Sequence, residues 1–175
     1  MFDLINGLPV HVLVVHGVAV LVPLTAVGAV AIAVRRGWRV TYGPLLTLIS
    51  LVATILCPIA TASGEELQQR VGDPGRHAEL GEWMVWVMIP LTLLVAALTV
   101  IERRGPAERA RGALGTGLAA LTALVAVGAV VLVVLIGDTG ARAAWEGRIQ
   151  SIGADPASSV SSVSSPPAPV AVVGA

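Results

Sequence analysis

Hydrophobic residues dominate the chain in four long runs, and these runs predict four membrane-spanning helices. The runs cover about residues 10–34, 45–62, 83–101 and 113–136, and none of them contains Asp, Glu, Lys or Arg. Each run is long enough to cross the ~30 Å hydrocarbon core of a bilayer as an α-helix. Because lipid offers no partners for backbone N–H and C=O groups, helices are the expected structure. The pattern therefore predicts an all-α fold, a four-helix transmembrane bundle.

Proline residues indicate where the helices start, since proline suits the first turn of a helix. One stands just before or inside the start of every run: Pro9, Pro44, Pro74 and Pro106. We expect helices at about residues 9–36, 44–63, 74–103 and 106–137, within a membrane domain of residues 1–152. The segment 153–175 is rich in Ala, Ser and Pro without periodicity, which is typical of a disordered tail.

Composition agrees with a membrane protein, and the arginines predict its orientation. Hydrophobic residues make up 55% of the chain, charged residues only 13%, and the mean hydropathy is +0.86, which excludes an ordinary soluble domain. All eleven basic residues are Arg. Seven lie in the loops after the first and third runs (35, 36, 39, 103, 104, 109 and 111), against four elsewhere (70, 76, 142 and 148). The positive-inside rule then places both termini on the outer, extracytoplasmic side of a bacterial inner membrane.

The first and third runs resemble each other. The stretch "VPLTAVGAVAIAVRRG" at 22–37 and the stretch "IPLTLLVAALTVIERRG" at 89–105 share P-L-T and R-R-G. Upstream, His11 precedes Pro23 by twelve residues, and His77 precedes Pro90 by thirteen. These similarities favour two duplicated helical hairpins in parallel orientation; chance likeness between two apolar stretches is the alternative.

Histidine is costly inside a membrane, so the three histidines are the first candidates for function. His11, His16 and His77 all fall near the predicted outer boundary. His16 lies roughly 10 Å of helix rise beyond Pro9, so we expect it to be buried and to face the bundle. The polar residues expected to share an outer-leaflet pocket with His16 and His77 are Thr61, Glu82, Asp138 and Arg142.

Three interpretations of these residues stay open. The histidines can be structural, bonding across helices near the interface. They can bind haem or a transition metal, with His16 and His77 as ligands and His11 nearby, because histidine is the commonest transition-metal ligand. They can also form a solute or proton-linked site with Glu82 or Asp138. No nucleotide loop, catalytic triad or carboxylate pair is present, so we predict a binding or accessory protein, not an enzyme.

Partners follow from the same composition. The lipid bilayer is the first, and nothing indicates nucleic acid binding. The fourth run is rich in Gly and Ala, which permits close helix packing, so a homodimer is expected.

Four short segments carry a family resemblance: "GLPVHVLVVH" at 7–16, "ATASGEEL" at 60–67, "HAELGE" at 77–82 and "GDTGARAAW" at 137–145. They resemble the bacterial membrane family catalogued as domain of unknown function 2231. The resemblance implies a small four-helix membrane protein. It also hints at a redox setting, and so at a respiratory or redox partner, because some members are fused to or encoded near Rieske-type iron–sulfur domains. The family's last motif usually reads Gly-His-x-Gly, whereas this chain has Asp138 at the histidine position, which weakens the haem interpretation.

Overall fold

Four long helices make up nearly all of the structure, a computed structural model that describes residues 4–5, 8–72, 75–106, 108 and 112–153. The helices are α1 (Val10–Val34), α2 (Arg36–Val71), α3 (Arg76–Arg104) and α5 (Ala113–Gly153). All four are long and apolar enough to cross a membrane, so the predicted all-α architecture with four candidate spans is confirmed. Two short strands, β1 (Leu4–Ile5) and β2 (Leu8–Pro9), pair antiparallel ahead of α1. The hydrophobic pattern did not predict them.

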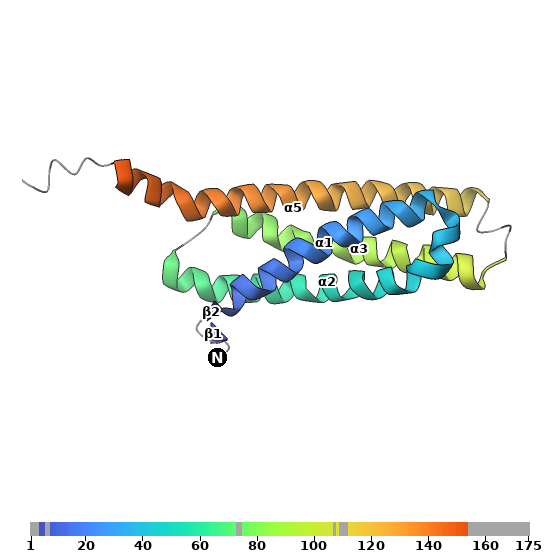
Figure 1. Ribbon diagram of the computed structural model, residues 1–175, viewed down its shortest axis with the longest axis horizontal. Helices are drawn as coiled ribbons and strands as arrows, with labels where there is room; N and C mark the ends of the chain where they lie inside the picture. Colours follow the sequence, from blue (N-terminus) through green and yellow to red (C-terminus); the bar gives the residue numbers. More distant parts are fainter. Residues whose placement is uncertain (1–3, 6–7, 73–74, 107, 109–111, 154–175) are drawn as a thin grey trace, which may run out of the picture.

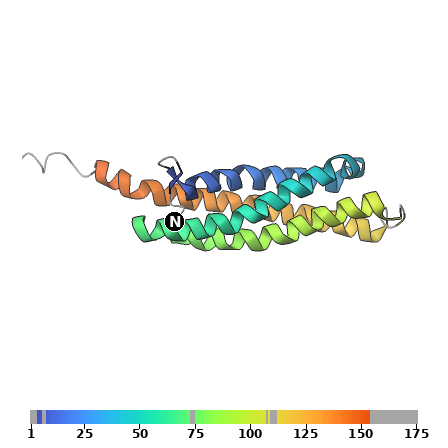
Figure 2. The ribbon, with the colours of Figure 1, turned by 90° about the horizontal axis from the view of Figure 1, so that it is seen from below.

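The helices form a four-sided bundle (Figures 1 and 2). Helices α1 and α3 each pack against both α2 and α5, and hardly touch one another, so they lie on a diagonal. His11 and His77 sit at the starts of α1 and α3, at the left in Figure 1; we call this the histidine end. The opposite end carries Arg35, Arg36, Arg39, Arg103 and Arg104, and we call it the arginine end.

Two helix boundaries differ from the predicted ones. Helix α2 begins at Arg36, so Pro44 lies inside the helix and does not mark its start. A proline inside a helix removes one hydrogen bond and permits a bend, and Figure 1 shows the first turns of α2 crossing the bundle end before the helix runs along it.

Helix α5 is displaced along the chain relative to the prediction. It begins at Ala113, not near Pro106, and continues to Gly153, past the predicted end at 137. The added turns contain Ala141, Ala143 and Ala144, and alanine is the residue that most favours helix. The predicted start of the third helix at Pro74 and the predicted tail after Gly153 lie outside the described residues.

Small and medium side chains fill the middle of the bundle. The buried apolar residues include Val22, Ala26 and Ala29 of α1, Ala53 and Cys57 of α2, Met84, Met88, Leu91 and Val95 of α3, and Ala126 and Ala129 of α5. Alanine at so many contacts allows the helices to approach closely, which is how membrane helices gain packing energy.

Hydroxyl groups join α2 to α3 within this core. The Oγ1 of Thr92 lies 2.5 Å from Ser50 Oγ and 2.8 Å from Thr54 Oγ1. Thr25, the P-L-T threonine of α1 that corresponds to Thr92, is fully buried, yet its hydroxyl has no partner among the described residues. The shared sequence motif thus occupies buried positions in both helices, with a polar contact in only one.

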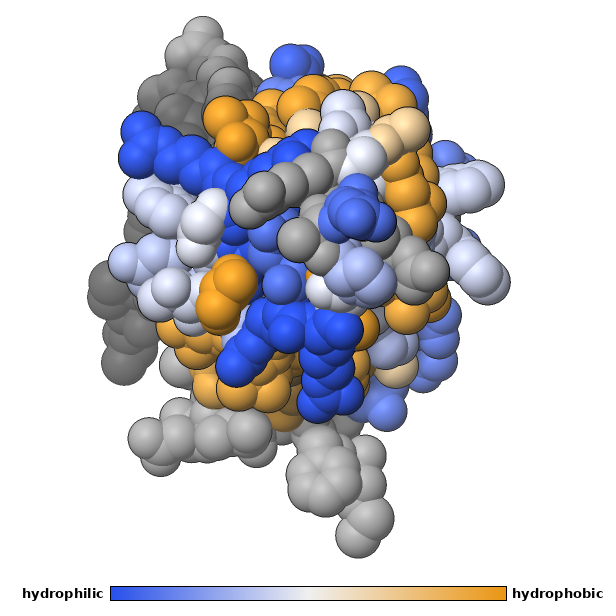
Figure 3. All heavy atoms as spheres, turned by 90° about the vertical axis from the view of Figure 1, so that its right-hand side faces the viewer, coloured by the Kyte–Doolittle hydropathy of each residue, from blue (hydrophilic) through white to orange (hydrophobic). Residues whose placement is uncertain are grey.

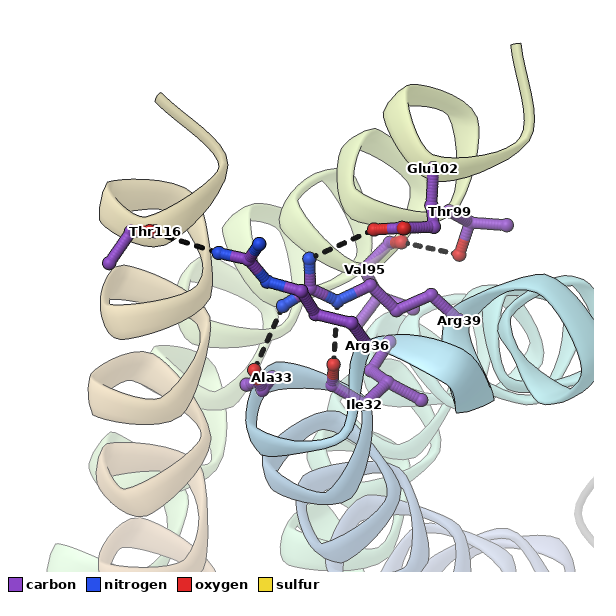
Figure 4. A network of polar contacts seen from close by, with 8 residues as sticks. All are labelled: Ile32, Ala33, Arg36, Arg39, Val95, Thr99, Glu102 and Thr116. Carbon is purple, nitrogen blue, oxygen red and sulfur yellow. Dashed lines mark hydrogen bonds and ion pairs between the residues drawn. The ribbon is translucent and has the colours of Figure 1, made fainter. Parts of the chain in front are cut away.

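A buried arginine holds the arginine end together (Figure 4). Arg39 is 1% exposed. Its Nε donates to the Ile32 carbonyl at 2.7 Å, and its two Nη groups donate to the Ala33 carbonyl at 2.9 Å and to Glu102 Oε2 at 3.2 Å. The last carbonyls of any helix lack helical partners, so Arg39 caps α1 while its ion pair fastens α2 to α3.

Arg36 adds a link to the fourth helix, donating from Nη2 to Thr116 Oγ1 of α5 at 3.1 Å. The start of α2 therefore contacts all three other helices. From the sequence, Arg39 is expected to be only a loop charge, because nothing in its neighbourhood indicates that the side chain turns inward.

Removing the carboxylate of this network should destabilise the bundle. Glu102→Ala leaves the buried Arg39 charge without its counter-ion, and we expect a loss of about 3 kcal/mol in the free energy of unfolding in detergent. Glu108→Ala, which removes an exposed carboxylate at the same end, should change it by less than about 0.5 kcal/mol. Equal effects of the two substitutions would contradict the role given to Arg39.

Candidate histidine site at one end of the bundle

His11 clamps the start of α1 onto α2. Its ring is half-buried, and Nδ1 lies 3.0 Å from the carbonyl oxygen of Ala60 and 3.3 Å from Ser63 Oγ. Ser63 itself donates to the Ala60 carbonyl at 3.0 Å. The ring passes over Gly64, where an added Cβ would lie 3.0 Å from His11 Cε1. A glycine at position 64 is therefore what lets the imidazole reach the α2 backbone.

His77 clamps the start of α3 onto α5 by the same contact. Its Nδ1 lies 3.0 Å from the carbonyl oxygen of Ile136, and its ring passes over Gly140. A Cβ on Gly140 would lie 2.8 Å from His77 Cε1, closer than real side chains approach. Thr139, like Ser63, donates to the carbonyl that the histidine uses, at 3.1 Å.

Both imidazoles are held in one tautomer. A carbonyl oxygen only accepts hydrogen bonds, so Nδ1 of each ring must carry the proton. In the neutral ring Nε2 then has a free lone pair, and neither Nε2 bonds to any described residue. The histidine end thus carries two ring nitrogens with defined tautomers, on the diagonal helices α1 and α3.

The prediction that His16 is buried in the bundle is wrong. His16 is exposed, and its Nδ1 bonds to the Val12 carbonyl of its own helix at 2.6 Å. Five residues turn a helix by roughly 140°, so when His11 points to α2, His16 points away from the site. His11, which the prediction placed nearby, lies at the same end of the bundle as His77 and bonds to α2 as His77 bonds to α5.

The other predicted pocket residues surround the site only loosely. Glu82 is exposed. Asp138 and Arg142 are also exposed and form an ion pair one turn apart on α5, with 3.0 Å between Oδ2 and Nε. Thr61 is half-buried but donates to the Cys57 carbonyl of its own helix at 3.3 Å. The structure brings His11 and His77 to one end of the bundle. These four residues take no part in the hydrogen bonds of either ring.

The residues that complete the site were not predicted. They are two backbone carbonyls, Ala60 and Ile136, two hydroxyls, Ser63 and Thr139, and two glycines, Gly64 and Gly140. A signal was available, because both hairpins carry Ser-Gly or Thr-Gly after their second apolar run. Across the described residues, no three His, Cys, Asp or Glu side chains lie where they could hold one metal ion.

Comparison with known proteins gives one match. Residues 7–153 match the family described as predicted membrane protein, DUF2231. The chain belongs to this family. The resemblance seen in the four short segments is thereby confirmed, and the DUF2231 description agrees with four helices that can cross a membrane. Neither a curated protein nor a solved structure matches the chain.

The glycine under His77 can be tested against a glycine one turn away on the same helix. Gly140→Ala should displace the imidazole and cost about 2 kcal/mol of unfolding free energy in detergent, through overpacking and the lost hydrogen bond. Gly137→Ala is the matched control, since a Cβ there meets nothing within 4 Å. The control should be neutral or stabilising by up to about 1 kcal/mol, because alanine favours helix. Equal free energies of unfolding for the two variants would show that the His77 contact does not stabilise the bundle.

Proposed function

We propose that this DUF2231 protein is a non-enzymatic binding or accessory protein of the membrane, and that His11 and His77 are its binding site. The observation that carries the proposal is that the two rings make equivalent hydrogen bonds. Each Nδ1 is fixed by a backbone carbonyl of the partner helix in its hairpin. Two lone pairs held in place at one end of a bundle suit a ligand that accepts electron pairs, which is a metal centre.

The fixing of Nδ1 is the arrangement that metal-binding histidines use. A histidine ligand ordinarily donates its second ring N–H to a carbonyl or carboxylate, which sets the tautomer and the ring orientation. Among the described residues, neither ring has a carboxylate as a hydrogen-bond partner.

A haem-binding redox protein is the second candidate function, and the ligand count favours it. A bare transition-metal ion is normally held by three or more protein side chains, and the described residues contain no such cluster. Haem iron needs only two axial ligands from the protein, and two histidines from facing helices can provide them. Gly64 and Gly140 let the two rings pack directly against the backbones of α2 and α5.

The equivalent contacts of His11 and His77 also support a duplicated hairpin. In each hairpin the bonded carbonyl belongs to the residue four before the glycine, and a hydroxyl residue immediately precedes that glycine. From position 60 to 136 and from 64 to 140 the offset is the same, 76 residues. We infer that the bundle arose from two copies of one hairpin, related by an axis along its length.

The same proposal includes orientation and partners. We place both termini and the histidine end outside the cytoplasm of a bacterial cell, because the arginine end carries the excess of basic residues. A second copy of the chain or a respiratory or redox protein is the expected partner. The most exposed apolar helix is α5, with Leu121, Leu124 and Val131 exposed on its surface.

The binding proposal is tested by the visible spectrum and metal content of the protein purified from its own membrane. We expect a Soret band or a bound transition metal in the wild type, and at least a tenfold loss of it in both His11→Ala and His77→Ala. His16→Ala is the matched control, since His16 lies on α1 but points away from the site; it should retain the ligand in full.

Two outcomes would contradict the proposal. A colourless, metal-free wild type that takes up neither haem nor Cu²⁺, Zn²⁺ or Fe²⁺ on titration would leave the histidines a structural role only. Ligand loss in His16→Ala equal to that in His77→Ala would place the site elsewhere. Circular dichroism of each variant checks that the helices have formed.

Orientation is tested by reporter fusions after Gly37, Gly75, Gly105 and Gly153. We expect cytoplasmic signal at Gly37 and Gly105 only, because the arginine-rich loops follow the first and third spans. A cytoplasmic signal at Gly75 or Gly153 would reverse the orientation without affecting the histidine site.

A further inference from the structure

A groove lies between α2 and α3 at the arginine end, at the opposite end of the bundle from the histidines. Its volume is about 590 Å³, and its lining residues are Pro44, Thr47, Ala96, Thr99, Val100, Arg103 and Arg104. It is open to the outside of the bundle. Figure 3 looks at this end of the molecule and shows hydrophilic side chains gathered over its middle, with apolar ones around them.

The wall of the groove is set by a close approach of the two helices. A Cβ on Gly43 would overlap the side chain of Thr99, so α2 and α3 nearly touch there. The two threonine hydroxyls of the lining are already used as donors, Thr47 to the Gly43 carbonyl and Thr99 to the Val95 carbonyl, both at 2.8 Å. Any charge recognition in the groove therefore falls to its arginines.

Arg103 and Arg104 bring positive charge that the described residues do not neutralise. Both are exposed, and neither has an ion pair with a described residue. The nearest carboxylate in sequence, Glu102, is engaged by Arg39. Guanidinium groups pair with phosphate through two parallel hydrogen bonds, so the open end of the groove suits a phosphate group.

The surface beside the groove is apolar and exposed along both helices. Leu93 and Val100 lie seven residues apart on one face of α3, and Leu45 and Leu48 flank the groove on α2; all four are at least half exposed. A ligand with a phosphate group and a hydrocarbon chain would contact both the two arginines and the apolar surface beside them. Inorganic phosphate would contact only the arginines.

We propose that the groove is a binding site for an anionic phospholipid. Arg103 and Arg104 bind the headgroup phosphate, and an acyl chain lies along α2 and α3 from Val100 toward Leu93. Anionic lipids are enriched where basic residues flank membrane helices, and the groove gives that attraction a defined place on the protein. The site is independent of the histidine site and of any ligand there.

Native mass spectrometry of the full chain in detergent tests the proposal, with phosphatidylglycerol as the probe. We expect phosphatidylglycerol to bind at least tenfold more tightly than phosphatidylcholine. The double substitution Arg103→Gln with Arg104→Gln should remove that preference. Arg35→Gln is the matched control at the same end, since Arg35 stacks over Trp38, 4.8 Å from the ring centre, and does not line the groove; it should keep the preference.

A second variant separates the groove from general surface charge. Ala96→Leu keeps both arginines but places a larger side chain in the groove, and it should weaken phosphatidylglycerol binding at least threefold. Equal binding of the two lipids, or equal weakening by Arg35→Gln, would overturn the proposal. So would inorganic phosphate at millimolar concentration displacing the lipid completely, because the acyl chain would then contribute nothing.

Discussion

A membrane-spanning helix has no water to bond with, so a polar side chain within the membrane is stabilised by a partner inside the protein. This constraint explains how the bundle is joined. Arg39 at one end and His11 and His77 at the other all donate to backbone carbonyls of a neighbouring helix. In the middle, Thr92 bonds to Ser50 and Thr54 across the α2–α3 contact. Hydrophobic packing alone would not select which helices meet, since lipid is as apolar as the side chains it replaces.

The same constraint has different consequences at the two ends of the bundle. At the arginine end, Arg39 donates to Ile32, Ala33 and Glu102 and has a structural role. At the histidine end each ring uses one nitrogen to join two helices, and the other nitrogen bonds to none of the described residues. A side chain that holds the fold with one atom and offers a ligand with another is suited to binding. The proposed function rests on these separate roles of the two ring nitrogens, one in the fold and one in binding.

The fold followed from the sequence because lipid exposure demands long uncharged runs, and four such runs are visible without a structure. The ends of α2 and α5 did not follow, since Pro44 is compatible both with a helix start and with a bend inside one. His11 and His77 could be named as candidates because the chain has only three histidines, all near the predicted outer boundary. His16 was expected to face the bundle because its distance from the helix start says nothing about its direction around the helix. Ala60 and Ile136 were missed because a backbone carbonyl has no sequence signature, and Arg39 because a buried arginine and a loop arginine look alike.

The central claim is that the Nε2 atoms of His11 and His77 bind one shared ligand. The chain contains only three histidines, so the ¹⁵N solid-state NMR spectrum of histidine-labelled protein in lipid bilayers resolves this claim directly. Comparing the protein as purified from its own membrane with the ligand-depleted protein, the account predicts that the Nε2 signals of His11 and His77 shift or broaden together, while those of His16 stay unchanged. Nε2 signals that are the same in both samples, or a change at only one of the two histidines, would contradict it.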